Sequence, residues 1–235
     1  MKKLVITLAV TIFLVTACTN PSGQVTQVAP EPALATSEPT AITLNPTVPV
    51  ESQPAAAAVV YKIVPGESSA SYEVGETFLN QNNRFNVAIG NTVQITGDVT
   101  VDTANPQNSQ IGRIEIDISQ LQSDSSRRDN ALRDRFLESN SYPTAVFTPT
   151  KITGLPASYT TGEPLTFQVT GDLTVKETTQ EVTFDVAAQI EGSDLVGTAT
   201  TTVLLSEFGI GPIEIGGVLK TEDQAKLTLS FVARP

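Results

Sequence analysis

The 235-residue sequence contains no histidine, no tryptophan and a single cysteine, Cys18. Without histidine, the Ser-His and Cys-His pairs that activate many enzyme nucleophiles cannot form. A metal site would depend on carboxylates alone, and Glu115, Asp117 and Asp124 do not match a recognised metal-binding loop. No glycine-rich phosphate loop follows a strand and opens a helix. We therefore expect a protein that is not an enzyme and that uses no cofactor.

Positive charge is also scarce. Fourteen Lys and Arg residues stand against 25 Asp and Glu residues, which gives a net charge of −11. Lys2 and Lys3 lie in a segment that we expect to be removed, so the mature chain has 14 − 2 = 12 basic residues and a net charge of 12 − 25 = −13. An acidic protein without a basic face binds nucleic acid poorly, which excludes that class of partner.

The first 17 residues have the pattern of an export signal, in which a charged start precedes an apolar run from Leu4 to Val15. This run is too short to span a bilayer comfortably. Small residues directly precede Cys18, as in a bacterial lipobox, where the signal is cut before a cysteine that carries a diacylglycerol. An unpaired cysteine is unusual in an oxidising compartment unless it is used covalently.

We therefore expect lipidation at Cys18, which would anchor the protein to the bacterial membrane on its extracytoplasmic side, in the cell envelope or periplasm. The alternative is an ordinary secretory signal whose cysteine happens to lie at the cleavage site. Residues 18–58 then form a tether rich in Pro, Ala, Thr and Ser. Such a segment buries too little apolar area to offset its ordering entropy, so we expect a disordered spacer. A glycosylated stalk is the other interpretation.

Residues 59–235 show the period-two alternation of β-strands, with turn residues between the runs. Two glycines at strand centres, Gly97 and Gly171, suit bends or bulges in a curved sheet. About eight strands and one helix predict an all-β antiparallel barrel or sandwich. The glycines favour the barrel, because strands coil sharply to close a small cylinder. The expected strands are 61–63, 70–74, 93–101, 114–118, 144–150, 165–175, 182–190, 195–205 and 227–233.

One short basic helix interrupts this pattern between Ser125 and Phe147, before a central strand. Ser125 or Ser126 is a suitable N-cap, and Tyr142-Pro143 would end the helix because the residue before proline prefers extended geometry. On such a helix one face carries Arg128, Leu132, Arg135 and Phe136.

Arg128 on the apolar face needs an anionic partner or several carbonyl groups. A structural interpretation pairs it with Asp129 or with an acid on a nearby strand. A functional interpretation places Arg128, together with Arg127, Arg133 or Arg135, against an anionic head group at the barrel mouth. The residues alone leave both open.

Three groups of residues, in this order along the chain, resemble the YceI-like family of lipocalin-like antiparallel barrels from bacteria. The resemblance covers about residues 60 to 233. Its one departure is the segment 176–181, where the family usually has a glycine- or histidine-containing turn. The matching residues are Arg128-Asp129 with Leu132, Phe136-Leu137 and Tyr142-Pro143-x-Ala145-x-Phe147; then Gly171 to Val175 with Val182-Thr183-Phe184; and finally Phe208-Gly209-Ile210.

The resemblance implies an elongated apolar cavity that binds a polyisoprenoid, an isoprenoid quinone or a similar long lipid, and it also allows a homodimer. A diphosphate head group would need a local positive field in this acidic chain, and the 127–135 segment is the cluster that supplies one. The alternative is a filled barrel that acts as an interaction module of the envelope. The candidate ligand-binding residues are Arg128, Asp129, Leu132, Phe136, Phe147, Phe167, Leu173, Phe184 and Phe208.

Overall fold

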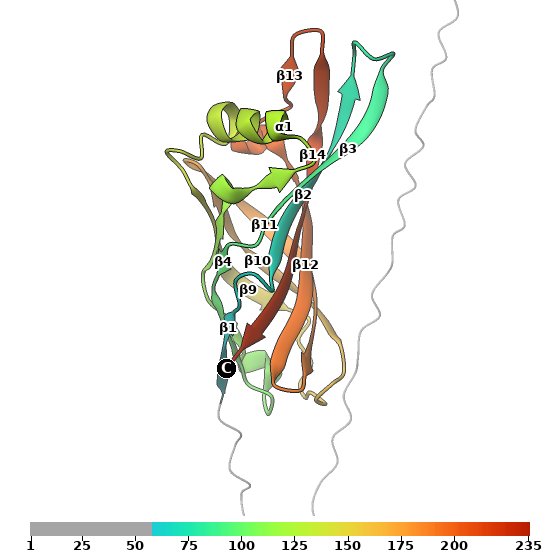
Figure 1. The fold of residues 1–235 in the computed structure, drawn as a ribbon. Helices are drawn as coiled ribbons and strands as arrows, with labels where there is room; N and C mark the ends of the chain where they lie inside the picture. The colour runs from blue at the N-terminus through green and yellow to red at the C-terminus, as the bar shows by residue number, and fades with distance from the viewer. Residues whose placement is uncertain (1–57) are drawn as a thin grey trace, which may run out of the picture. The chain divides into compact units, whose positions relative to one another are not determined.

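The computed structural model describes residues 58–235 (Figure 1). The predicted signal peptide, Cys18 and all but the last residue of the predicted tether lie outside these residues. The short helices are η1 (Pro106–Asn108), η2 (Ile118–Gln120), α1 (Ser126–Ala131), η3 (Leu132–Phe136) and η4 (Leu205–Phe208). The strands are β1 (Val59–Ile63), β2 (Ser69–Phe78), β3 (Arg84–Thr92), β4 (Ile95–Thr96), β5 (Asp98–Val101), β6 (Gln110–Ile111), β7 (Ile114–Asp117), β8 (Gln122–Ser123), β9 (Thr144–Thr153), β10 (Leu165–Val175), β11 (Thr178–Glu191), β12 (Asp194–Leu204), β13 (Glu214–Ile215) and β14 (Leu219–Arg234).

The strands form one antiparallel barrel. Several short strands continue one another, so that eight runs make the wall: β1 with β2, β3 with β4 and β5, β6 with β7, and then β9, β10, β11, β12 and β14. The ring closes because β14 pairs with both β12 and β2, while β4 pairs with β7 and so joins the second run to the third, and β7 pairs with β9. This arrangement confirms the predicted fold class, including the helix inserted before β9.

Alternation along the strands builds the interior. Inward-facing aliphatic and aromatic residues from nearly every run form one buried cluster, for example Ile95, Val169 and Ala225. The described strands pair with one another around one main buried cluster, so residues 58–235 have the contacts of a domain that folds by itself. The predicted role of Gly171 is confirmed, because the β9–β10 register shifts between Thr170 and Gly171. A Cβ on Gly171 would lie 2.5 Å from the Thr148 carbonyl oxygen.

Strands β2 and β14 are longer than predicted, and two further elements differ in kind from the sequence prediction. Strand β3 was not predicted, because its large apolar residues face outward while the small Ala88 and Gly90 face the barrel interior. The helix also ends earlier than the predicted Tyr142-Pro143 stop. Its last turn, η3, is π-helical and closes when the Leu137 amide donates to the Leu132 carbonyl, after which Glu138 adopts a left-handed backbone conformation.

Candidate ligand-binding cavity

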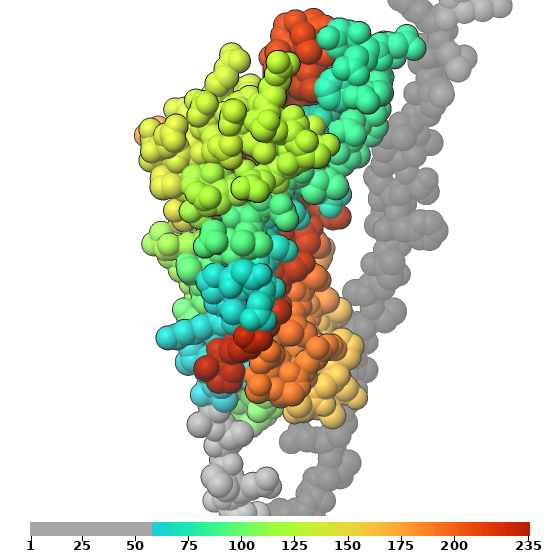
Figure 2. All heavy atoms as spheres, viewed as in Figure 1, coloured from blue at the N-terminus to red at the C-terminus, as the bar shows by residue number. Residues whose placement is uncertain are grey.

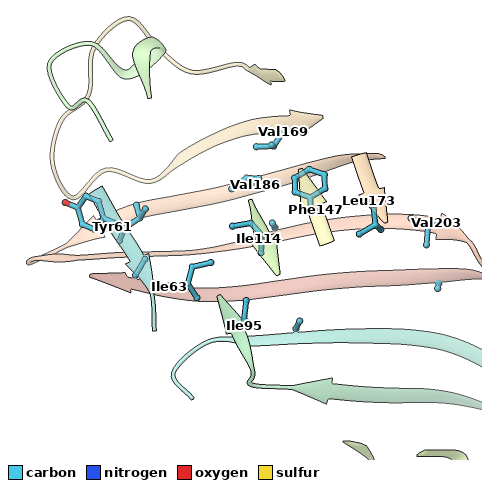
Figure 3. Close-up of a cluster of buried hydrophobic side chains, with 14 of the residues drawn as sticks. Tyr61, Ile63, Ile95, Ile114, Phe147, Val169, Leu173, Val186 and Val203 are labelled. Carbon is cyan, nitrogen blue, oxygen red and sulfur yellow. The ribbon is translucent and has the colours of Figure 1, made fainter. Parts of the chain in front are cut away.

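The barrel encloses an apolar cavity of about 700 Å³. Its wall comes from all the long strands, and Figure 3 shows inward-pointing residues from several of them, including Phe147, Leu173 and Val203. Such a volume lies within the range of 300–1,000 Å³ that is typical of small-molecule sites. The polar residues on its wall are few, and within residues 58–235 the only arginines among them are Arg127 and Arg128. The cavity can therefore accommodate an apolar molecule, with both of these arginines at the end that the helix covers.

Eight of the nine candidate ligand-binding residues line this cavity. From the helix these are Arg128, Leu132 and Phe136, and from the wall they are Phe147, Phe167, Leu173, Phe184 and Phe208. Phe147 and Phe184 contact each other edge to face, with ring centroids 5.0 Å apart. The sequence could place these aromatic residues because inward positions recur every second residue along a strand. That each contacts a ligand stays a prediction.

Helices α1 and η3 cover one end of the cavity (Figure 1). The helix starts at Ser125, whose side-chain oxygen accepts from the Arg128 amide and so satisfies one of the free amides at the helix start. Beneath the helix a second buried cluster of Ile118, Leu137 and Ala145 packs against Leu132. This apolar contact fixes the cover over the barrel end.

The β10–β11 turn fastens the far end of this cover. Lys176 donates to the Phe136 carbonyl, at 3.3 Å, and forms an ion pair with Glu138. The next residue, Glu177, accepts a 2.7 Å hydrogen bond from the Tyr142 hydroxyl, which raises the pKa of that phenol. The 176–181 segment that departs from the family pattern therefore has a structural role in this chain.

Arg128 is held by carboxylates of the protein itself. Its Nε and Nη2 atoms donate to the two oxygens of Glu76, at 3.0 and 2.8 Å. Its Nη1 donates to Ser123 Oγ at 2.9 Å and to the Asp124 carboxylate. The side chains of Arg128 and Glu76 are only 15% and 5% exposed. The hydrogen bonds to Glu76 raise the already high pKa of Arg128, and the Arg128 guanidinium lowers the pKa of Asp124.

This geometry supports the structural interpretation of Arg128, with an acid on a nearby strand as its partner. Glu76 lies 52 residues earlier in the chain, on β2, so the ion pair joins the helical cover to the barrel wall. Bidentate pairing of a guanidinium with a carboxylate fixes both distance and orientation.

Asp129 also has a structural position. It is buried, it does not line the cavity, and its Oδ1 accepts from the amide and the hydroxyl of Ser123, at 3.0 and 2.6 Å. These bonds tie the helix to β8, which pairs with β3. A direct contact between Asp129 and a ligand has no support from this arrangement.

Arg127 also lies at the helical end of the cavity. The sequence indicated it as a head-group contact only together with Arg128. Arg127 is exposed and lines the cavity, and its side chain makes no ion pair or hydrogen bond within residues 58–235. Asn80 and Gln81, from the β2–β3 turn, line the same end. The sequence did not predict that Asn80 and Gln81 line the cavity, because the preceding strand was expected to end near residue 74, whereas β2 extends to Phe78.

A tyrosine secures the opposite end of the cavity. Tyr159 lies in the β9–β10 loop and lines the cavity, and its hydroxyl oxygen accepts from the amides of Ile190 and Gly162, at 3.1 and 3.3 Å. These bonds hold the loop against the end of β11. The predicted candidates did not include Tyr159, because it lies outside any alternating run.

Within residues 58–235 no three His, Cys, Asp or Glu side chains are grouped as a metal site would require. In the same part of the chain no helix is long and apolar enough to cross a bilayer.

A model of the YceI-like domain matches residues 61–233, which is nearly the whole described barrel. The chain belongs to the YceI-like family. Among curated relatives, UPF0312 proteins of Pseudomonas putida strains GB-1 and W619 are each 37% identical over 124 residues. That match spans 49% of this chain and 60% of the length of each relative.

Solved structures share the fold of this YceI-like domain. Burkholderia cenocepacia BcnA superposes with a TM-score of 0.57 at 18% identity, over 72% of this chain and 98% of that protein. A polyisoprenoid binding domain from Saccharophagus degradans superposes with a TM-score of 0.55 at 11% identity, over 74% and 97% of the two chains. At these identities the likeness extends to the fold alone.

A buried phenol beside the Arg128 cluster makes the YceI-like domain sensitive to high pH. The Tyr72 ring packs on Gly90, and its buried hydroxyl has no hydrogen-bond partner in the described part of the chain. Burial raises the pKa of Tyr72 to about 12 from an ordinary value of about 10. A raised pKa means that folding favours the neutral phenol. This contribution is complete below pH 10 and is lost as the pH rises towards 12.

We therefore expect the free energy of unfolding to fall by about 2–3 kcal/mol between pH 10 and pH 12 because of Tyr72 alone. Urea unfolding of wild type and Tyr72→Phe at several pH values measures this difference. The variant should lose less stability across that range, and equal losses in the two proteins would contradict the assignment.

Proposed function

We propose that this protein binds a long apolar lipid, of the polyisoprenoid or isoprenoid quinone type, inside the barrel. The observation that carries the proposal is the apolar cavity of about 700 Å³ that the closed wall encloses. The fold relative from Saccharophagus degradans, which is a polyisoprenoid binding domain, supports it. A fully packed interior would instead have favoured the interaction-module alternative.

The free energy of burying apolar surface favours a ligand built from repeated apolar units. Burial of one five-carbon isoprene unit contributes roughly 3–4 kcal/mol at about 0.8 kcal/mol per carbon. The ordering of the lipid and its loss of freedom on binding offset much of this gain. Affinity would thus come from the aromatic and aliphatic wall, and orientation from polar groups at one end.

For the head group the structure favours Arg127 over Arg128. The Arg128 guanidinium already donates to Glu76, Ser123 and Asp124, whereas Arg127 is exposed at the cavity end. A diphosphate at this end would accept charge-assisted hydrogen bonds from Arg127. Asn80 and Gln81 are close enough to the same end to contribute amide donors.

We expect Arg127→Gln to weaken binding of a polyisoprenyl diphosphate by about fivefold to tenfold at low salt, because it removes one charge-assisted contact at an exposed site. Binding of an uncharged isoprenoid quinone should not change. Fluorescence titration with both ligands measures the two affinities. The control is Arg135→Gln, since Arg135 is exposed on the same helical segment but does not line the cavity. Equal losses in both variants, or for both ligands, would contradict the head-group role.

The cellular setting that we propose follows from the N-terminal sequence. Acylation of Cys18 would hold the barrel at the extracytoplasmic side of the bacterial membrane, where isoprenoid lipids are present. The lack of histidine supports a binding role without catalysis. Metabolic labelling with a radioactive fatty acid tests the anchor, and label should be absent from a Cys18→Ser chain.

A further inference from the structure

Two β-hairpins project beyond the barrel at the same end as the helical cover (Figure 1). One is formed by β2 and β3, the other by β13 and β14, and their tips are joined because the Leu79 amide donates to the Val218 carbonyl at 2.9 Å. Figure 2 shows the two tips side by side as a protrusion above the helix. We call residues 78–85 and 213–220 the paired tips.

Exposed large apolar residues concentrate on these hairpins. Ten such residues occur in the part of the chain that the structure describes, and six of them lie on the two hairpins: Leu79, Phe85, Val87, Ile89, Ile215 and Val218. Large apolar groups gathered at a surface mark a site of interaction rather than random exposure. On β3 they occupy every second position, so the outward face of that strand is apolar over residues 85–89.

The charge of the paired tips differs from that of the chain as a whole. The tips, residues 78–85 and 213–220, contain a single acid, Glu214, although the chain carries a net charge of −11. They contain two cations: Arg84, stacked 4.9 Å from the centre of the Phe78 ring, and Lys220, which is 3.6 Å from Glu214. The neighbouring helical segment adds the exposed Arg127 and Arg135. An anionic surface would be attracted to this end and repelled by most of the remaining protein.

The paired tips are continuous with the cavity. Phe78, Asn80, Gln81, Ile215 and Val218 belong both to the tips and to the cavity lining. A lipid that leaves the cavity between the helical cover and the tips would therefore pass over apolar side chains. This continuity distinguishes the tips from a patch on the side of the barrel.

We propose that the paired tips dock onto the surface of a lipid bilayer and insert Leu79, Phe85 and Val218, so that the cavity opens towards the membrane that supplies or receives its lipid. This inference rests on the proposed lipid-binding function. Exposed apolar side chains flanked by cations are the usual composition of a segment that lies in the interface of an anionic membrane.

The length of the N-terminal segment is compatible with this orientation. From Cys18 to residue 58 there are 58 − 18 = 40 residues, which can span at most about 140 Å. Strand β14, the longest in the barrel at 16 residues, measures about 50 Å. The N-terminal segment leads into β1, which pairs with the last residues of β14. The paired tips lie at the first residues of β14, and so at the opposite end of the barrel. A chain anchored at Cys18 could thus bring the opposite end of the barrel to the same membrane.

Flotation of the 58–235 domain with vesicles of phosphatidylcholine and phosphatidylglycerol in a 4:1 ratio tests the docking, since this fragment has neither the signal nor Cys18. We expect the wild-type domain to float, less so at 0.5 M salt, and Leu79→Ser/Phe85→Ser to bind at least tenfold more weakly. These two side chains do not line the cavity and are 44% and 56% exposed, so their loss should leave the melting temperature nearly unchanged.

The matched control is Val59→Ser/Val60→Ser, at the opposite end of the barrel, where the side chains are 39% and 46% exposed. It should float like wild type. A wild-type domain that does not float, or two double variants that float equally, would overturn the docking proposal. So would light scattering that shows a wild-type dimer and a monomeric Leu79→Ser/Phe85→Ser variant, because the tips would then join two copies.

A second readout separates this proposal from the proposed function. Uptake of an isoprenoid quinone dispersed in mild detergent does not require a bilayer, so the tip variant should take it up like wild type. Transfer of the same quinone from vesicles should slow at least tenfold in the tip variant. Uptake from detergent without flotation would overturn the docking alone, and flotation without uptake from any source would overturn the lipid-binding function alone.

Discussion

Replacement of Arg128 by methionine is expected to lower the free energy of unfolding by about 3–5 kcal/mol, because it leaves the Glu76 carboxylate buried without its partner. Methionine preserves most of the apolar stem, so the loss reports the charge and its hydrogen bonds. The helical cover should loosen along with the ion pair, since Arg128 joins α1 to β2. Urea unfolding monitored by circular dichroism measures the change.

A double-mutant cycle isolates the ion pair. Glu76→Gln alone should also destabilise the domain, and the Arg128→Met/Glu76→Gln variant should lose less than the sum of the two single losses. Arg127→Met, on the exposed neighbour, serves as the control and should change stability by no more than about 0.5 kcal/mol. If Arg128→Met kept wild-type stability but lost affinity for anionic lipids, Arg128 would be a head-group ligand after all.

The second large effect concerns the cavity itself. Ala199 on β12 is a small, buried residue of its lining, and Ala199→Phe would place a ring in the space that we assign to the lipid. We expect affinity for a long-chain isoprenoid quinone to fall at least tenfold. The fold should persist, because an internal cavity can accept added volume more readily than a packed core can.

Thr202→Phe is the matched control for this substitution. Thr202 lies on the same strand but is exposed and does not line the cavity. Its affinity for the quinone should equal that of wild type. Equal quinone binding by wild type and by a folded Ala199→Phe domain would place the ligand elsewhere.

Much of the barrel could be predicted from local patterns. Alternation identified the runs that became β7, β10, β11 and β12, because one face of each is buried and the other faces water. The same alternation predicted that Phe147, Leu173 and Phe184 face the interior. Strand β3 could not be predicted in this way, because its apolar residues face outward and its inward residues are small. These outward apolar residues of β3 belong to the hairpins that we propose to dock onto a bilayer.

The ion pair that fixes the helical cover shows the limit of local patterns. The sequence indicated that Arg128 needs an anionic partner, yet Glu76 lies 52 residues away and meets it only when the barrel closes. The π-helical end of the cover depends likewise on packing of Leu137 against Ile118 and Ala145, which are distant in the sequence from one another. Tertiary contacts of this kind decide between interpretations that the sequence leaves open.

The most direct test of the proposed function is mass spectrometry of an organic extract from the full-length protein purified out of its own bacterium in mild detergent. We predict one dominant isoprenoid lipid at close to one molecule per barrel in wild type, and a much smaller amount in Ala199→Phe. The extract of Thr202→Phe should match that of wild type. An extract without isoprenoid lipid, from a protein that also gains no thermal stability from added isoprenoid quinones or alcohols, would contradict the proposal that this barrel carries a lipid.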